Sequence, residues 1–110
     1  MTLILALSYG SREEIADATR KIALKVKNGE LSPDDIDNEI LSQHLDTAEF
    51  PDPDLLIRTS GEFRLSNFLL WQLSYAEIFI PEKNWPDFRK SDFREALENY
   101  SRRHRRFGRV

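Results

Sequence analysis

The amino-acid sequence predicts an α/β protein with a partial parallel sheet of about three strands and flanking helices. Short apolar runs, typical of strands buried on both faces, alternate with segments whose apolar residues recur at helical spacing. Few such runs are visible in 110 residues, whereas a sheet commonly has roughly five or six strands. We therefore expect either half of a larger fold or a chain that must associate.

The first half of the chain contains one expected strand and two expected helices. Residues 3–7, LILAL, are apolar on both faces and predict a strand that needs cover on both sides. After Tyr9-Gly10, Ser11 and Glu14 have the spacing of a capping box, and helical periodicity continues to Asn28-Gly29. The run Ser32-Pro33 then predicts the start of a shorter helix through residues 36–41.

The second half begins with the turn sequence PDPD at residues 51–54 and continues with a short strand, LLI, at 55–57. A polar loop follows, and Ser66 or Asn67 is expected to cap a helix over residues 68–75. EIFI at 77–80 predicts another strand. After the loop KNWPDF, Ser91 is expected to cap a last helix that ends near Gly108.

Composition narrows the class of protein. A chain with 40% hydrophobic residues and no low-complexity segment is expected to be one globular unit. The formal net charge of -3 argues against a nonspecific nucleic-acid binder, and the absence of cysteine excludes disulfides and thiolate nucleophiles. No apolar stretch reaches the roughly 20 residues of a membrane span. We expect a cytoplasmic protein without a transmembrane segment.

The loop IRTSGEFRLSN, residues 57–67, is a candidate anion site. In open α/β sheets ligands bind beyond the carboxyl ends of the strands, and Arg58 follows such an end. Guanidinium groups of Arg58 and Arg64, the Ser66 hydroxyl and free N–H groups at a helix start would together suit a phosphate. The alternative is that both arginines are surface residues paired with acidic neighbours, namely Asp54, Glu62 or Glu77.

Three other features keep two interpretations each. Glu77 opens an otherwise apolar strand, so it is expected either to bind a metal or to pair with an arginine. The arginine-rich end, SRRHRRFGRV, fits a nucleic-acid arm or the favourable placement of cations at a helix C-terminus. The apolar run at residues 68–80 fits a protein core or a groove for a lipid or aromatic ligand.

Several motifs together resemble the C-terminal half of the cis-prenyltransferases, the undecaprenyl diphosphate synthase family. They are PDPDLLIRTSGEFRLSNFLLWQLSYAEIFI from Pro51, then NWPDF, then RRHRRFG, and the opening ALSYGSREEI is also similar. The resemblance implies that residues 1–110 are a single C-terminal portion of such a domain, with the N-terminal half absent. It implies a transferase that condenses isopentenyl diphosphate onto an allylic diphosphate such as farnesyl diphosphate, with Mg²⁺, making long cis-polyprenyl diphosphates.

The resemblance also assigns residues. It implies that Arg58, Arg64 and Ser66 bind the diphosphate of isopentenyl diphosphate, and that Glu77 helps to place Mg²⁺. Arg106 and Gly108 match an Arg-x-Gly motif that reaches the partner's diphosphate site in a dimer. A homodimer or larger assembly is therefore expected, and the lipid product could bring it to a membrane surface.

An absence qualifies the expected activity. The family's His-x-Met-Asp-Gly-Asn-type loop, which holds Mg²⁺ and the allylic diphosphate, does not occur in this sequence. The chain alone is therefore expected to be inactive. The alternatives are a noncatalytic diphosphate-binding module or a partner subunit of a heteromeric cis-prenyltransferase. No residue in the chain is a convincing general base.

Overall fold

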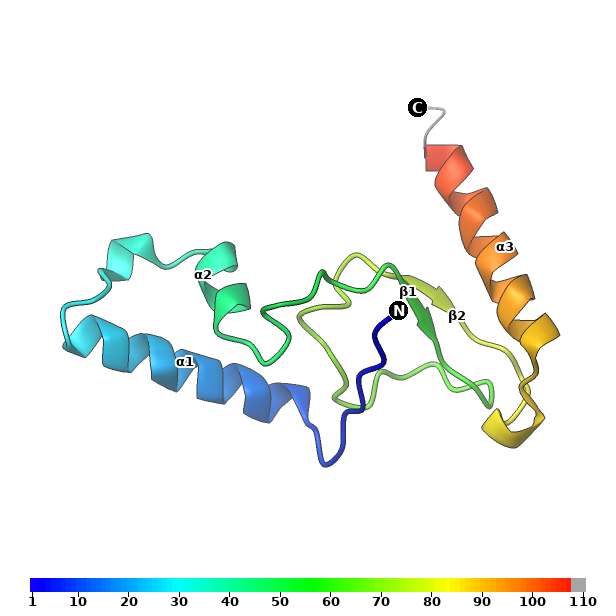
Figure 1. Ribbon diagram of the computed structural model, residues 1–110, viewed down its shortest axis with the longest axis horizontal. Coiled ribbons are helices and arrows are strands. Elements are labelled where there is room, and N and C mark those ends of the chain that lie inside the picture. The colour runs from blue at the N-terminus through cyan, green and yellow to red at the C-terminus, as the bar shows by residue number, and fades with distance from the viewer. Residues whose placement is uncertain (108–110) are drawn as a thin grey trace. The chain divides into compact units, whose positions relative to one another are not determined.

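The structure, a computed structural model, describes residues 1–107 and confirms the α/β class (Figure 1). The chain forms two compact units. The first consists of Met1–Asp52 and Leu65–Trp71, and the second of Pro53–Arg64 and the chain from Gln72 onward. The chain between the two strands of the second unit therefore includes a stretch, residues 65–71, that belongs to the first unit. None of the described helices has the length and hydrophobicity that a membrane span needs.

Helix α1 (Ser11–Lys27) dominates the first unit and confirms the helix expected from the periodicity. Its Ala18 and Ile22 are buried, as is Leu45 farther along the chain, and these residues form the apolar interior of the unit. Acidic residues in the first turn and lysines in the last turn match the helix dipole. The chain leaves the helix through Gly29, whose φ of 76° lies in the left-handed region that glycine adopts without strain.

The predicted capping box of α1 is wrong. The N-cap residue is Gly10, and its position has no side-chain hydrogen bond. Ser11 and Glu14 are both buried, and each bonds elsewhere in the unit. The Ser11 hydroxyl accepts from the Leu70 N–H at 2.9 Å, and Glu14 Oε2 accepts from the Asp46 N–H at 2.9 Å. Tertiary partners have replaced the local bonds that the spacing indicated.

Two short helical segments follow in place of the single short helix that was expected. The 3-10 helix η1 (Pro33–Asp35) begins with a capping box in which the Asp35 carboxylate accepts from the Ser32 N–H at 3.0 Å. The extended backbone of Ile36 and Asp37 then interrupts the helix. Helix α2 (Asn38–Gln43) begins anew because the Asp37 carboxylate accepts from the Ile40 N–H at 2.9 Å.

The expected strand at residues 3–7 is not formed. Its backbone has no regular secondary structure, and its apolar side chains are exposed: Leu3 to 81%, Ile4 to 55%, Leu5 to 74% and Leu7 to 83%. A strand forms only where a neighbouring strand takes its backbone hydrogen bonds. Among the described residues the sheet has two strands, β1 and β2, and neither pairs with this segment.

The second unit contains that sheet. Strands β1 (Leu55–Ile57) and β2 (Glu77–Phe79) are parallel, with Leu55 opposite Glu77 and Ile57 opposite Phe79. Backbone bonds continue on both sides of the ladder, from the Arg58 N–H to the Phe79 carbonyl and from the Glu77 N–H to the Asp54 carbonyl. Both strands confirm the sequence prediction, but the described sheet has two strands where about three were expected.

The helix expected over residues 68–75 is also absent, because this stretch forms turns. Ser66, Asn67 and Leu69 have φ values of 51°, 63° and 45°, which lie in the left-handed region. A right-handed helix cannot begin through such residues. Residues 65–71 instead belong to the first unit, where Asn67 bonds to the beginning of α1.

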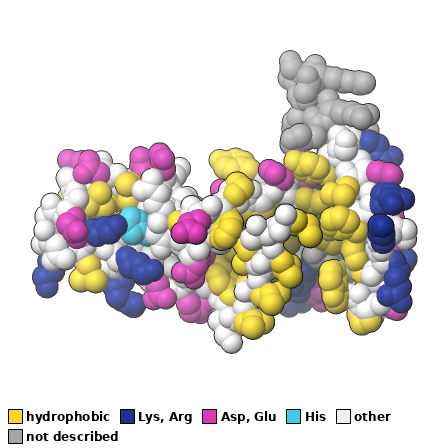
Figure 2. All heavy atoms as spheres, in the orientation of Figure 1, with side chains coloured by type: hydrophobic (Ala, Val, Ile, Leu, Met, Phe, Trp, Pro, Cys, Tyr) yellow, Lys and Arg dark blue, Asp and Glu magenta, His cyan; other side chains and the backbone are white. Residues whose placement is uncertain are grey.

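Helix α3 (Lys90–Phe107) follows the short 3-10 helix η2 (Trp85–Asp87). Asp92 stabilises its first turn, not Ser91 as expected, because the Asp92 carboxylate accepts from the Arg89 N–H at 2.8 Å and from Lys83 Nζ at 2.9 Å. Hydrophobic side chains lie along one side of α3, and lysines and arginines lie along the other (Figure 2). The buried Ala96 is on this helix.

Candidate functional site

Arg58 stands at the carboxyl end of β1, where a ligand of an open α/β sheet is expected. Its backbone N–H is held by the Phe79 carbonyl at 3.0 Å. The side chain is partly buried, and it has no hydrogen bond or ion pair with any residue that the structure describes. A partly buried guanidinium with all its donors available is suited to an anionic ligand.

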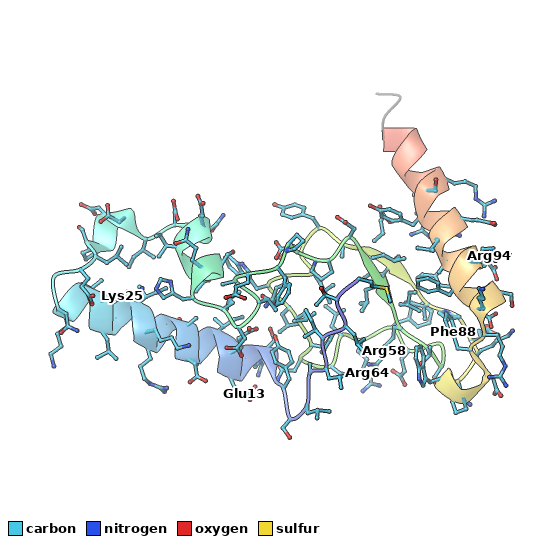
Figure 3. All side chains as sticks on the ribbon, in the orientation of Figure 1. Glu13, Lys25, Arg58, Arg64, Phe88 and Arg94 are labelled. Carbon is cyan, nitrogen blue, oxygen red and sulfur yellow. The ribbon has the colours of Figure 1, made fainter. Side chains whose placement is uncertain are left out.

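Arg64 lies later in the same loop and in the same unit; both arginines are labelled in Figure 3. Its Nε is 3.6 Å from Glu62 Oε2, and its side chain is 82% exposed. One of the acidic partners considered from the sequence is therefore present. An exposed ion pair at this distance contributes little free energy, so a more highly charged ligand would readily displace Glu62 from Arg64.

The turn between the two arginines is fixed by the loop that follows β2. The Ser60 N–H donates to the Lys83 carbonyl at 2.8 Å, and the Gly61 N–H donates to the Pro81 carbonyl at 2.9 Å. The Ser60 hydroxyl is also 2.7 Å from Asn84 Oδ1. Gly61 has a φ of 65°, a conformation that favours glycine. These bonds hold the first part of the loop to residues 81–84 of the same unit.

Ser66 belongs to the first unit, whereas Arg58 and Arg64 belong to the second. The structure thus brings the two arginines into one unit, and the chain connects Arg64 to Ser66 across one residue. The Ser66 hydroxyl is exposed and has no hydrogen-bond partner among the described residues.

Asn67, next to Ser66, caps a helix, but the helix is α1 and not the expected one after it. Its backbone carbonyl accepts from the Ser11 N–H at 2.8 Å, and its Oδ1 accepts from the Arg12 N–H at 2.9 Å. Its Nδ2 donates to Glu13 Oε2 at 3.1 Å. Sequence analysis missed this role, because the contact joins residues 55 positions apart and leaves no local pattern.

A second group of contacts lies beside Asn67. The ring of Tyr9 packs edge-on against Phe68 with their centroids 5.7 Å apart, and the Tyr9 hydroxyl donates to Glu14 Oε1. Burial raises the pKa of Tyr9 above its ordinary value, and the bond to Glu14 raises it further. The first turn of α1 and residues 67–70 therefore share both polar and aromatic contacts.

Glu77 opens β2 and forms an ion pair with helix α3. Arg103 Nη1 lies 3.2 Å from Glu77 Oε2 and 3.5 Å from the Ile78 carbonyl oxygen. Tyr100 precedes Arg103 by about one turn of α3, and the charge of Glu77 also acts on it. Burial raises the pKa of its phenol, and the carboxylates of Asp54 and Glu77 raise it further. The arginine partner that the sequence left open for Glu77 is Arg103, a residue that sequence analysis did not single out.

The residues at Glu77 fit Mg²⁺ only as part of a larger ligand set. A carboxylate is a proper ligand for this hard cation, and Mg²⁺ often takes one or two carboxylates with substrate phosphates and waters. Among the described residues no group of three or more carboxylate, imidazole or thiol side chains is placed to hold a metal ion. Glu77 can thus supply one ligand, with diphosphate oxygens supplying others.

The remaining candidates are the last ones in the chain. Gly108 and the side chain of Arg106 lie outside the part of the protein that the structure describes. The apolar run at 68–80 is mixed: Gln72 and Leu73 are buried, while Tyr75 is fully exposed. Neither of the two interpretations of this run accounts for all of it.

Comparison with known proteins identifies the class to which this fold and loop belong. The family model described as "Putative undecaprenyl diphosphate synthase" matches residues 1–108. The chain therefore belongs to the undecaprenyl diphosphate synthase family of prenyltransferases, and the family resemblance of its motifs is confirmed.

Individual relatives agree with the family model. The chain is 52% identical over 110 residues to an isoprenyl transferase of Porphyromonas gingivalis, covering 100% of this chain and 43% of the relative. It is 56% identical over 106 residues to a tritrans,polycis-undecaprenyl-diphosphate synthase (geranylgeranyl-diphosphate specific) of Methanocaldococcus jannaschii, covering 94% of this chain and 38% of the relative. The chain thus spans about two fifths of the length of these relatives.

A solved structure has a similar fold. It is the lavandulyl diphosphate synthase of Lavandula x intermedia in complex with dimethylallyl diphosphate, with a TM-score of 0.84 and 54% sequence identity. The match covers 87% of this chain and 42% of that one. The fold class therefore agrees with that of a known prenyl diphosphate synthase.

Proposed function

We propose that this chain binds the diphosphate of isopentenyl diphosphate and supplies that site to an enzyme that condenses it onto an allylic diphosphate. The observation that carries the proposal is the guanidinium of Arg58, unpaired and partly buried at the carboxyl end of β1. Arg64, exposed and weakly paired, and the free Ser66 hydroxyl are the other ligands. Family membership and the diphosphate named for the lavender enzyme support the same ligand class.

In the proposed reaction the allylic diphosphate loses its diphosphate group, and the double bond of isopentenyl diphosphate attacks the carbon left behind. Loss of a proton then sets the cis double bond of a long polyprenyl diphosphate. This chain's residues contribute binding and orientation of the substrate. These are the protein's main contributions to catalysis when the reacting groups need only be held in the correct position. Mg²⁺, when bound with Glu77 as one ligand, would neutralise charge on a departing diphosphate.

Calorimetric titration of the chain with isopentenyl diphosphate tests the proposal. Losing one charge-assisted set of hydrogen bonds should weaken binding by about tenfold to a hundredfold in Arg58→Ala. Arg94→Ala is the matched control, because Arg94 is an exposed arginine of α3 in the same unit (Figure 3). Equal affinities of the parent chain, Arg58→Ala and Arg94→Ala would contradict the proposed site.

A turnover assay separates the enzyme from its alternatives. Radiolabelled isopentenyl diphosphate and farnesyl diphosphate are incubated with the chain, alone and together with a polypeptide that carries the remaining part of a relative. Product only in the combined sample supports the proposed contribution to catalysis. Binding without product in either sample would favour a noncatalytic diphosphate-binding module.

A further inference from the structure

We propose that Asn67 is a positioning residue, which holds Ser66 in place for the diphosphate by capping helix α1 from a distant part of the chain. The inference rests on the proposed function, because it concerns the hydroxyl assigned there to the ligand. The contacts that carry it form what we term the α1 clasp, which consists of Ser11, Arg12, Glu13, Asn67 and Leu70.

The clasp supplies what the beginning of α1 lacks. The first N–H groups of a helix have no partner within the helix and need a cap. The N-cap residue is glycine and has no side chain to provide one. The Asn67 backbone carbonyl accepts a hydrogen bond from the Ser11 N–H at 2.8 Å, and its side-chain Oδ1 accepts one from the Arg12 N–H at 2.9 Å. A distant asparagine thus acts as the cap, and helix α1 fixes the position of Asn67 in return.

The same bonds fix the backbone on either side of Asn67. The Leu70 N–H donates to the buried Ser11 hydroxyl at 2.9 Å, so residues 67 and 70 are both tied to the first residue of α1. Between and beside these ties, Ser66, Asn67 and Leu69 all have left-handed φ values. Non-glycine residues keep such conformations only where surrounding contacts hold them. Without the clasp, we expect this stretch to relax to other conformations.

Ser66 is the residue whose orientation depends most on this arrangement. Its hydroxyl has no partner among the described residues, so the backbone, at a φ of 51°, sets the direction of the Cα–Cβ bond from which the hydroxyl reaches a ligand. The adjacent Asn67 holds that backbone through three hydrogen bonds to α1. Loss of the Asn67 side chain should therefore weaken diphosphate binding although Asn67 is not assigned to the ligand.

Gly10 gives a second way to disturb the clasp. A Cβ atom at Gly10 would lie 2.1 Å from Glu13 Oε2 and 2.9 Å from Asn67 Nδ2, too close for either to stay in place. Its φ is -140°, which alanine adopts freely, so the substitution acts by contact and not by backbone strain. Gly10→Ala should displace the Glu13 and Asn67 side chains without altering residue 66 or 67.

The experiment combines amide hydrogen exchange with titration of isopentenyl diphosphate on the whole chain. In Asn67→Ala we expect exchange at the Arg12 amide to accelerate and diphosphate affinity to fall, each by about tenfold, since two side-chain bonds are lost. Gly10→Ala should change both quantities in the same direction. Asn67→Asp keeps the acceptor for Arg12 but sets a carboxylate against Glu13, so it should restore part of the loss.

Ile22→Val is the control, because it weakens the interior of the first unit without touching the clasp. It should leave the affinity unchanged, which separates positioning from general destabilisation. If Ser66→Ala binds isopentenyl diphosphate more weakly than the parent chain but Asn67→Ala binds it equally well, the positioning role is overturned. The proposed function would remain intact. If Ser66→Ala also binds like the parent chain, the assignment of Ser66 fails, and Arg12 exchange still reports whether Asn67 caps α1.

Discussion

Arg103 of helix α3 forms an ion pair with Glu77 of strand β2, at 3.2 Å between Nη1 and Oε2. The Arg103 side chain is 49% exposed and that of Glu77 is 25% exposed, so the pair is accessible to solvent on one side. A cation that binds Glu77 must share the carboxylate with this guanidinium or displace it. The pair connects the last helix to the sheet, and if Mg²⁺ binds Glu77 as proposed, Arg103 and Mg²⁺ would compete for this carboxylate.

The first prediction follows from that competition. With isopentenyl diphosphate present, Arg103→Gln should lower the Mg²⁺ concentration needed for half-maximal binding by up to about fivefold, since a partly exposed pair contributes no more than about 1 kcal/mol. Glu77→Gln should raise it, because an amide is a poorer ligand for Mg²⁺. Arg102→Gln is the control, as an exposed neighbour on the same helix. Superimposable Mg²⁺ titrations of Glu77→Gln and parent would make Glu77 a structural ion-pair partner only.

The second prediction ranks the two arginines of the loop. Arg58→Ala should weaken isopentenyl diphosphate binding more than Arg64→Ala, because Arg58 is partly buried and unpaired, whereas Arg64 is 82% exposed beside Glu62. Arg58→Lys should restore little, since lysine lacks the planar fork that matches a phosphate. Titration calorimetry of the three variants checks the order. A larger loss in Arg64→Ala would show that the ligand sits nearer the tip of the loop.

Local signals predicted helix α1, whose hydrogen bonds join near neighbours in the chain, and the two short strands that pair with each other. Strands β1 and β2 and helix α1 were predicted from short apolar runs and helical spacing, and the structure confirms them. The strand at 3–7 and the helix at 68–75 were wrong for a common reason: tertiary partners decide them. Leu3 to Leu7 have no partner strand among the described residues, and Asn67 bonds to α1 in place of capping its own neighbours.

In the candidate site, too, the sequence indicated residues that lie close together in the chain and missed partners from distant positions. The polar loop after a strand predicted Arg58 and Arg64 as ligand candidates, and both lie in the second unit. The partners Arg103 for Glu77 and Asn67 for α1 come from distant positions, and no spacing rule finds them. Diphosphate binding by Arg58, Arg64 and Ser66, the Mg²⁺ ligand role of Glu77, the roles of Arg106 and Gly108, and the cytoplasmic location stay predictions.

The third prediction concerns pH and Asp92. The Arg89 N–H and the Lys83 ammonium hold the pKa of Asp92 below its ordinary value of 3.8. A carboxyl whose pKa is lowered on folding adds stability above its unfolded-state pKa, and that stability is lost as pH falls through the folded-state value. Asp92→Asn should therefore lower the Tm at pH 7, and its difference from the parent should shrink below pH 3.8. A difference that is constant from pH 7 to pH 2 would contradict this role.

The fourth prediction uses the division into two units. Ile22→Ala should lower the free energy of unfolding of the first unit by about 2 to 4 kcal/mol, because it empties a buried site on α1. Amide exchange should accelerate along α1 and much less along α3, which belongs to the second unit. Equal acceleration in both helices would show that the two units unfold together.

The last prediction is that the chain self-associates. Leu3, Leu5 and Leu7 are exposed on a segment without a partner strand, and each strand of the two-stranded sheet has one unpaired edge among the described residues. Unpaired edges and exposed apolar groups favour association.

Sedimentation equilibrium should show a dimer or larger species, and Leu3→Lys with Leu5→Lys should shift it toward monomer, because a charged amine is costly to bury. Lys21→Leu, which adds an apolar group on the exposed part of α1, controls for a general effect of surface hydrophobicity. A monodisperse monomer of the parent chain at micromolar concentration would contradict the prediction, and an unchanged oligomer in the double lysine variant would move the interface away from residues 3–7.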